Sequence, residues 1–270
     1  MDLGLKGSVI AVTGGGAGIG QGISRACLAE GARVVVLSHN SEHVQKFLAE
    51  TQRDGRPCEL IVSDLAEQDQ CKKAIEYIAV QYGRLDGLVN NAGRNDSVGL
   101  ESGSPERFEA SLRSNLLHYY ALAHFALPML KATRGSIVNI SSKVALTGQG
   151  NTSAYAAAKG AQLALTREWA AELIQYGIRV NAVLPAEVLT PLYEAWVGRQ
   201  PDPKAALKHI SGQIPLEGRM TTAAEIAAAV VFLLSSTQSG HTTAQHIIVD
   251  GGYVHLDRML TAKVQNSTRA

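Results

Sequence analysis

The feature that most constrains the fold is a regular alternation of two kinds of segment. Short runs rich in β-branched residues are separated by longer stretches in which apolar residues recur at helical spacing. This rhythm is typical of βαβ units, in which strands run parallel and helices cover the sheet. We expect strands at residues 8–12, 33–37, 58–62, 85–90, 135–140, 178–183 and 246–249. We expect helices at about 18–30, 41–53, 67–82, 105–131, 153–176 and 222–235, with a less regular stretch near 190–211.

The expected strands are apolar along their whole length, which indicates that both faces of the sheet are covered. The chain has 270 residues, of which 46% are hydrophobic and 18% charged, enough apolar material for one large core. No repeat, low-complexity tract or linker divides it. We therefore predict a single α/β domain over residues 1–270, a Rossmann-type doubly wound sheet of seven mostly parallel strands with helices on both faces.

Charge and hydropathy argue against two classes of partner. Lysines and arginines are scattered over a chain of net charge +1, with no basic run that would track a nucleic acid or an anionic membrane surface. The first apolar stretch, residues 9–12, runs directly into glycines and is too short for a signal-peptide core or a membrane span. We expect a cytoplasmic protein that binds neither nucleic acid nor membrane.

Cysteine and histidine usage argues against a disulfide framework and against a metal site. Cys27, Cys58 and Cys71 are odd in number and lack C-x-x-C spacing, which fits structural thiols in a reducing compartment. His39 and His43 have helical i,i+4 spacing, but no third ligand follows nearby. We therefore predict no metal.

A glycine-rich turn, residues 13–20 with the sequence T-G-G-G-A-G-I-G, directly follows the first strand and opens a helix. Glycines allow a close backbone approach to a pyrophosphate, and the helix presents its N–H groups and positive dipole end to the anion. Glycines alone can simply make a tight turn, but a strand before and a helix after favour a dinucleotide. The expected cofactor contacts are Gly14, Gly16, Gly18, Ile19 and Gly20.

The spacing of this turn, T-G-x-x-x-G-x-G, differs from the general Rossmann fingerprint G-x-G-x-x-G. Together with motifs further along, it resembles the short-chain dehydrogenase/reductase family, whose motif order it follows over nearly the whole chain. The remaining motifs are Asp64-Leu65 after the third strand, the N-N-A-G segment Asn90 to Gly93 after the fourth, Asn115, Ser142, Tyr155 and Lys159.

The resemblance implies a nicotinamide dinucleotide as cofactor. It implies that Asp64, with Leu65 beside it, contacts the adenine. It also implies that Asn91, Ala92 and Gly93 line the cofactor pocket while steadying the sheet.

The end of the second strand normally separates the two dinucleotides, because an acidic residue there bonds the ribose 2′-hydroxyl and repels a 2′-phosphate. Here the position is Ser38, followed by His39 and Asn40. Neither a carboxylate that would exclude the phosphate nor an arginine that would bind it is present. We predict relaxed use of NAD or NADP.

Tyr155 and Lys159 are four residues apart on an expected helix, so the phenol and the ammonium can reach the same site. A free phenol has a pKa near 10, too high for a general base at neutral pH. We expect the ammonium and a positive nicotinamide ring to lower that pKa. The resemblance implies that Lys159 also bonds the nicotinamide ribose.

Ser142 lies at the end of the fifth strand, where the loops of a parallel sheet build their site. Its hydroxyl can stabilise the charge that develops on the substrate oxygen. Its neighbour Ser141 is an alternative from position alone, and the family's spacing favours Ser142. The resemblance implies that Asn115 kinks its helix around a water and links Lys159 to solvent for proton relay. Asn115, Ser142, Tyr155 and Lys159 are therefore the predicted catalytic residues.

The proline-rich segment at about 185–218 breaks the βα rhythm, and we predict that it covers the substrate. An ordinary surface connection is the alternative. Its start resembles the family's P-G-x-x-x-T stretch, which implies that Pro185, Val188 and Thr190 hold the nicotinamide carboxamide. Ala186 replaces the usual glycine and restricts the backbone there.

Two stretches, residues 185–193 with 201–203 and residues 249–258, look like those of bacterial L-fucose dehydrogenases, which oxidise an aldose at its anomeric carbon to a lactone. A sugar pocket needs directional polar groups beside an apolar platform. Packing or solvent exposure is an equal alternative for Glu187 and Trp196. The expected substrate residues are Ser142, Gln149, Asn151, Tyr155, Glu187, Tyr193 and Trp196.

Two other functions remain open from the sequence. One is a 3-oxoacyl reductase-like enzyme or another ketone/alcohol oxidoreductase on the same scaffold, and the other is a dinucleotide-binding sensor without catalysis. Family members are commonly tetramers, and the helix at 153–176 is apolar on more than one face. We therefore expect a homotetramer.

Overall fold

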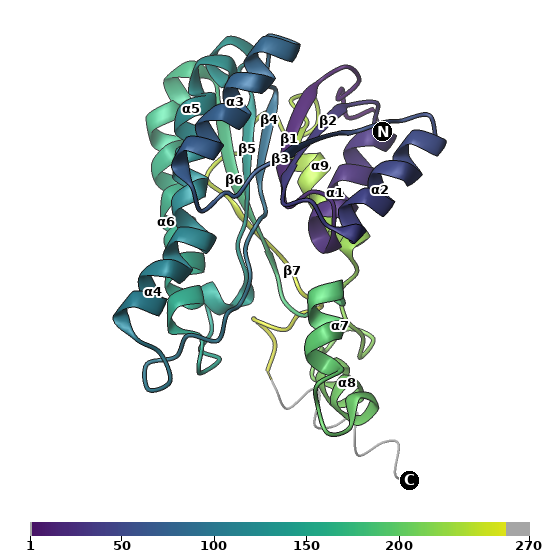
Figure 1. Ribbon diagram of the computed structural model, residues 1–270, viewed down its shortest axis with the longest axis vertical. Coiled ribbons are helices and arrows are strands. Elements are labelled where there is room, and N and C mark those ends of the chain that lie inside the picture. Colours follow the sequence, from purple (N-terminus) through teal and green to yellow (C-terminus); the bar gives the residue numbers. More distant parts are fainter. Residues whose placement is uncertain (1, 258–270) are drawn as a thin grey trace.

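The computed structural model describes residues 2–257, and these build one seven-stranded sheet in which every neighbouring pair is parallel (Figure 1). The strand order is β3-β2-β1-β4-β5-β6-β7. Strands β2 and β3 are added on one side of β1 and strands β4 to β7 on the other, so the winding of the chain changes side between β1 and β4. The predicted doubly wound fold is confirmed. The strands are β1 (Val9–Thr13), β2 (Arg33–Ser38), β3 (Glu59–Val62), β4 (Gly87–Asn90), β5 (Ser136–Ile140), β6 (Arg179–Pro185) and β7 (His246–Val249).

Helices cover both faces of this sheet (Figure 1). One face carries α1 (Gly18–Ala29), α2 (Glu42–Arg53) and α9 (Ala223–Leu234). The other carries α3 (Gln68–Tyr82), α5 (His118–Thr133) and α6 (Ser153–Leu173). The long helix expected at 105–131 is present in two parts, because a π-helical segment, Arg113–Leu117, joins α4 (Pro105–Leu112) to α5.

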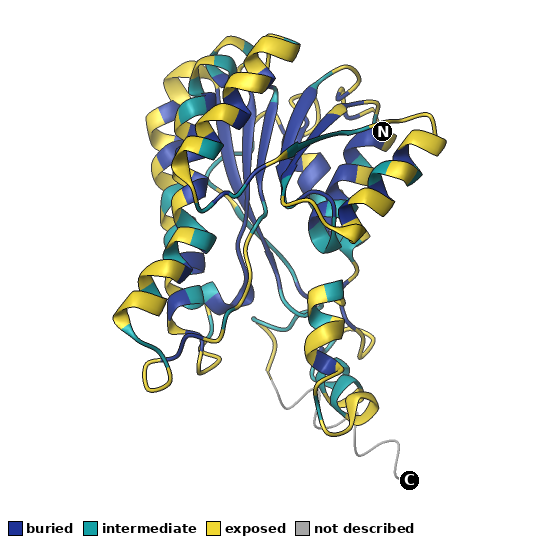
Figure 2. Cartoon of the chain, in the orientation of Figure 1, coloured by how far each residue is buried: buried dark blue, intermediate teal, exposed yellow. Residues whose placement is uncertain are grey.

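The sheet lies between two hydrophobic cores because successive strand residues point to opposite faces. In β1, Val12 packs in the core beneath α1 and α9, whereas Ala11 packs in the core beneath α3, α5 and α6. All five residues of β1 are buried, as Figure 2 shows for the central strands. The carboxyl ends of these strands therefore meet at one rigid edge, where the predicted site residues lie.

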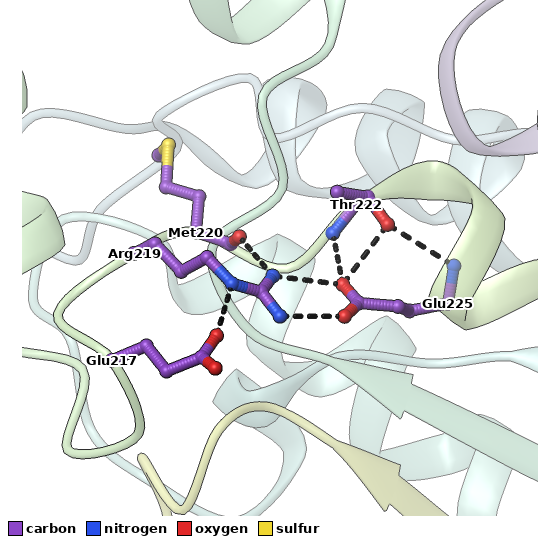
Figure 3. Close-up of polar contacts among 5 residues, drawn as sticks. All are labelled: Glu217, Arg219, Met220, Thr222 and Glu225. Atoms are coloured by element: carbon purple, nitrogen blue, oxygen red, sulfur yellow. Dashed lines mark hydrogen bonds and ion pairs between the residues drawn. The ribbon is translucent and has the colours of Figure 1, made fainter.

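The segment between β6 and α9 contains two short helices, α7 (Pro191–Val197) and α8 (Pro203–Gly212), which extend beyond the sheet (Figure 1). Its return is fixed where α9 begins (Figure 3). Thr222 and Glu225 form a capping box, and Arg219 donates to Glu225 Oε1 at 2.7 Å and to Glu217 Oε2 at 2.6 Å. Arg219, aided by Thr222, lowers the pKa of Glu225 to about 2.

The residue before this capping box contacts the segment that is predicted to bind substrate. Thr221 forms a parallel bridge with Val188, and its N–H donates to the Glu187 carbonyl at 3.0 Å. The backbone around Glu187 is therefore held from α9. Whether residues 185–218 cover a substrate remains a prediction.

Beyond β7 the buried Asp250 accepts hydrogen bonds from the N–H groups of Gly252 and Val254, both at 2.8 Å. The last residue of the stretch 249–258 lies outside the described residues. Within residues 2–257, no helix is long and apolar enough to cross a membrane.

Candidate active site

The glycine-rich turn runs from the end of β1 into α1. Ala17, at the N-cap of α1, makes no side-chain capping bond, so the first N–H groups of the helix lack a cap from that residue. Gly14 has φ +61°, and a Cβ on Gly20 would lie 2.2 Å from the Gly14 carbonyl oxygen. The turn therefore requires glycine at both positions and leaves a helix N-terminus that fits a dinucleotide pyrophosphate.

Other predicted residues of this turn have different neighbours. Gly16 is buried against α2, where an added Cβ would meet Val44 Cγ2 at 2.6 Å, so packing alone explains that glycine. A Cβ on Gly18 would lie 3.2 Å from the Thr190 side chain. The glycine-rich turn and the predicted carboxamide loop are thus adjacent. Ile19, next to Gly18, is partly buried.

The N-N-A-G segment is tied to β1 through Thr13. The Thr13 hydroxyl accepts from the N–H groups of Asn91 and Ala92, both at 2.8 Å, and Asn91 Nδ2 donates to the Thr13 carbonyl at 2.9 Å. A Cβ on Gly93 would lie 2.8 Å from Asn115 Oδ1. These contacts steady the point where the strand order reverses.

The residues expected around the adenosine half lie at the carboxyl ends of β2 and β3. Ser38 ends β2 and is partly buried, and His39 is exposed. Asn40 Oδ1 accepts from Gln45 Nε2 at 2.7 Å. Asp64 Oδ1 accepts from the Ala66 N–H at 3.0 Å, which shapes the turn before the buried Leu65 packs into the core.

Three of the predicted catalytic side chains lie around the ends of β5 and α6. Ser142 follows β5 and hydrogen-bonds to Tyr155, which lies in the first turn of α6. Lys159 lies one turn further on, with Nζ 5.5 Å from the centre of the Tyr155 ring. Ser141 donates instead to the Lys159 backbone carbonyl at 2.9 Å, so the two serines have separate partners.

Burial changes the pKa of both residues of the pair. It raises the pKa of Tyr155 to about 12, with the Ser142 hydrogen bond acting in the opposite direction, and it lowers the pKa of Lys159 to about 7. We expected the ammonium to lower the pKa of the phenol, but in the protein without its cofactor the opposite effect of burial is larger. Both groups lie where burial disfavours their charged forms.

Asn115 lies in the π-helical segment, where the long helix was expected to kink, and is buried. Its Oδ1 accepts from the Arg94 N–H at 2.8 Å, and its Nδ2 donates to the Ser111 carbonyl at 3.0 Å. Its own backbone carbonyl accepts from Gln162 Nε2 at 2.7 Å. Gln162 is a residue that the motifs did not single out. The feature of the sequence that could have identified Gln162 is an amide side chain among apolar and small residues of α6, one turn beyond Lys159.

The predicted substrate residue Glu187 is partly buried and forms an ion pair with the buried Lys143, which directly follows Ser142. Tyr193 of α7 hydrogen-bonds to Glu187, and burial raises the pKa of Tyr193 well above its usual value, with Glu187 adding to the effect. The Lys143 ammonium also lies 4.1 Å from the centre of the Tyr253 ring. In the structure Glu187 is therefore paired with Lys143 rather than exposed to solvent. The sequence motifs did not point to Lys143, although it directly follows the motif residue Ser142.

The other predicted substrate residues are more exposed. Trp196 is half-exposed and meets Tyr193 edge to face, with ring centres 5.4 Å apart. Gln149 and Asn151 are exposed on the loop before α6.

Asp96, after the N-N-A-G segment, was also missed. Its Oδ1 is buried and has no hydrogen-bond partner within residues 2–257, and its charge contributes to the raised pKa of Tyr155. In that same described part of the chain, no group of three His, Cys, Asp or Glu residues is arranged to hold a metal.

The chain is similar to known dehydrogenases and reductases over most of its length. Residues 14–254 match a family model described as enoyl-(acyl carrier protein) reductase. L-fucose dehydrogenase of Bos taurus is 38% identical over 247 residues, covering 91% of this chain and 89% of the relative. The solved structure of the Cj0485 dehydrogenase is 44% identical, with a TM-score of 0.90 and coverage of 96% and 98%. The ligand-free aldohexose dehydrogenase of Thermoplasma acidophilum is 31% identical, with a TM-score of 0.84 and coverage of 95% and 98%.

Proposed function

This chain belongs to the short-chain dehydrogenase/reductase family and is a nicotinamide-dependent oxidoreductase, and we propose that it oxidises the anomeric hydroxyl of L-fucose or a related aldose to a lactone. The observation that carries the proposal is the adjacency of two groups of side chains. Ser142 and Tyr155 form the reacting pair, and the charged pair Lys143 and Glu187 begins at the very next residue. The bovine and archaeal relatives named for sugars support it.

Tyr155 is the general base in this proposal. The substrate hydroxyl gives its proton to the Tyr155 oxygen while the carbon–oxygen double bond forms, and Ser142 donates a hydrogen bond to the substrate oxygen as charge develops there. The dinucleotide, when bound, supplies the hydride acceptor. Because burial raises the pKa of Tyr155 to about 12, the base needs positive charge nearby, which Lys159 supplies.

Substrate recognition falls to the polar groups around this pair. Lys143 donates and Glu187 accepts, so together they can bond to neighbouring hydroxyls of a sugar ring, with Tyr193 alongside. Asp96 Oδ1 is buried without a hydrogen-bond partner in the described chain, so it can accept a hydrogen bond from a further sugar hydroxyl. We also assign Trp196 as the apolar platform and the exposed Gln149 and Asn151 as groups that close on the sugar.

The dinucleotide is proposed to be NAD or NADP without strong preference. Ser38, His39 and Asn40 provide neither a carboxylate against the 2′-phosphate nor an arginine for it. The ratio of kcat/KM for the two cofactors should stay within about a hundredfold, equivalent to about 2.7 kcal/mol. A larger ratio in either direction would contradict relaxed use.

We propose a homotetramer that uses the outer face of α5 and α6. Tyr120 is exposed there, stacks on His124 with ring centres 5.9 Å apart, and lies 6.5 Å from the Trp169 ring. An exposed aromatic group of this kind fits a contact with a second copy. Light scattering should give four times the chain mass, and Tyr120→Glu should reduce it. A monomeric wild type would refute this assembly.

We place the protein in the cytoplasm, since its thiols fit a reducing compartment. Burial raises the pKa of Cys27 to about 12 and that of Cys71 to about 11, so both stay protonated as inert core groups. Cell fractionation checks the location, and recovery with the membrane or the exported fraction would contradict it.

The deciding experiment is a screen of aldoses and of acyl-thioester ketones with both dinucleotides. We expect oxidation of L-fucose, and of stereochemically related D-arabinose or L-galactose, to the lactone. A Thermotoga maritima relative named 3-oxoacyl-(acyl-carrier-protein) reductase, 34% identical, makes the second candidate a 3-oxoacyl reductase-like enzyme, which would act on the thioesters alone. Retention of the cellular function by Tyr155→Phe would instead indicate a sensor that needs no chemistry.

A further inference from the structure

Gln162 lies one helical turn beyond Lys159 on α6 and is completely buried. Its amide connects two of the predicted catalytic residues. Gln162 Oε1 accepts from Lys159 Nζ at 3.3 Å, and Gln162 Nε2 donates to the Asn115 carbonyl at 2.7 Å. The link thus joins the ammonium on α6 to the π-helical segment that interrupts the long helix.

The other partners of the ammonium are also neutral oxygens. Lys159 Nζ donates to the Ile140 carbonyl at 2.7 Å and to the Tyr119 hydroxyl at 3.4 Å. An ammonium has three N–H donors, and with Gln162 all three have a protein partner. The position of the charge next to Tyr155 is therefore set by three oxygens, and Gln162 supplies the one from a side chain of the same helix.

The helix backbone at Gln162 is tied to the sheet. Its backbone carbonyl accepts from the Thr166 hydroxyl at 2.7 Å, and that hydroxyl accepts from Asn139 Nδ2 at 3.0 Å. Asn139 Oδ1 in turn accepts from Asn90 Nδ2 at 3.0 Å. This chain of hydrogen bonds runs from β4 through β5 to α6 and ends at the backbone carbonyl of Gln162. It therefore ties the helix to the sheet without touching the side-chain amide.

We propose that Gln162 is a positioning residue that fixes the Lys159 ammonium by coupling it to the Asn115 carbonyl. An amide differs from water in this role. Water exchanges its donor and acceptor functions and can relay a proton, whereas the amide presents a fixed acceptor to Lys159 and a fixed donor to Asn115. Gln162 therefore orients the charge that Tyr155 needs and does not conduct protons along this link.

The test compares Gln162→Met with Thr166→Val. Methionine keeps the length and the apolar volume of glutamine but removes both hydrogen bonds, whereas Thr166→Val is an equally buried change on the same helix that leaves the amide in place. We expect Gln162→Met to lower kcat roughly tenfold to a hundredfold, the usual value of a hydrogen bond to a charged group. The acidic limb of kcat against pH should move to higher pH, because a less well-held ammonium favours phenolate less.

Thr166→Val should lower the unfolding temperature and leave that limb where it is. A wild-type limb in Gln162→Met, or the same displacement in both variants, would overturn the proposal. Should Gln162→Met fail to fold, Gln162→Glu places a carboxylate beside the ammonium and must also move the limb to higher pH. An unchanged limb there would equally overturn the proposal.

The inference rests on the proposed chemistry at Tyr155, but not on the sugar. The pH profile is measured with whichever compound of the screen turns over. Binding of each oxidised dinucleotide, followed by quenching of tryptophan fluorescence, needs no turnover, and Gln162→Met should weaken it while Thr166→Val should not. Failure of the aldose proposal therefore leaves this test intact, and dinucleotide affinity equal to wild type in Gln162→Met would count against the positioning role.

Discussion

Lys143 and Lys159 are two buried lysines on either side of the reacting pair, and they have opposite surroundings. Lys143 faces the carboxylate of Glu187 and the ring of Tyr253. Lys159 bonds only to neutral oxygens, and burial lowers its pKa to about 7. The Glu187 carboxylate favours the charged form of Lys143, whereas Lys159 has no counter-charge to offset the cost of its burial. The contrast supports the proposed division, in which Lys143 serves substrate recognition and Lys159 serves proton chemistry.

The largest expected effect separates the two lysines by kinetics. Lys159→Met should lower kcat by roughly a thousandfold, because Tyr155 then lacks the positive charge that allows it to act as a general base. Lys143→Met should mainly raise KM for the sugar, with kcat/KM falling roughly tenfold to a hundredfold, as for a lost hydrogen bond to a charged group. Initial rates of dinucleotide reduction give both values. Equal losses of kcat in the two variants would erase the distinction.

The next effect concerns the pH dependence of stability. The pKa of Lys159 is about 7 in the folded chain against an ordinary 10.5, so between these values the unfolded chain holds a proton that the folded chain lacks. The free energy of unfolding of the wild type should therefore rise with pH across this window. Below the window, the destabilisation caused by burying the charged ammonium is fully present.

Lys159→Met carries no such proton. Relative to wild type, its free energy of unfolding should improve as pH falls through the window, by up to roughly 5 kcal/mol. Urea unfolding at several pH values measures the difference. A difference that stays constant with pH would show that Lys159 is not penalised by burial.

Lys143 should behave in the opposite way. Lys143→Met strands the Glu187 carboxylate, and we expect a loss of about 3 kcal/mol in the free energy of unfolding, most of it regained when Glu187→Gln is added. The exposed pair of Arg113 and Glu109 is a matched control, because Arg113→Met should cost less than about 1 kcal/mol. Similar costs for the two pairs would mean that Lys143 and Glu187 are effectively solvated.

The smallest effect lies outside the site, at the capping box of α9. Thr222→Ala removes the cap and should cost about 1 kcal/mol of stability. Kinetic constants should remain those of the wild type, because Thr221 still bridges to Val188. Thermal unfolding and initial rates check this, and a raised KM would show that the anchor also shapes the substrate side.

The sequence was sufficient for the sheet because its central strands are buried on both faces and read as continuous apolar runs. Each strand begins and ends within two residues of its predicted limits, as with β1 (Val9–Thr13) against 8–12. The π-helical segment at Arg113–Leu117 was not predictable from periodicity, since one shifted turn leaves the apolar pattern of a long helix almost unchanged. Only the family resemblance pointed to a kink at Asn115.

The motifs indicated the reacting residues but not their supports. Lys143, Asp96 and Gln162 carry no motif, and each acquires its role from a residue distant in sequence: Glu187, Tyr155 and Asn115 respectively. Burial was also invisible in the spacing of Tyr155 and Lys159, although it raises the pKa of one and lowers that of the other. Pairings made by the fold, rather than local patterns, decide these properties.

The central claim is that Tyr155 takes the proton from an aldose hydroxyl. The most direct measurement is the oxidation of L-fucose by wild type and by Tyr155→Phe, following reduced dinucleotide and lactone together. We expect one reduced dinucleotide for each lactone formed, and a loss of at least roughly a thousandfold in kcat for the variant. Absence of turnover on every aldose, or a Tyr155→Phe rate equal to that of the wild type, would contradict it.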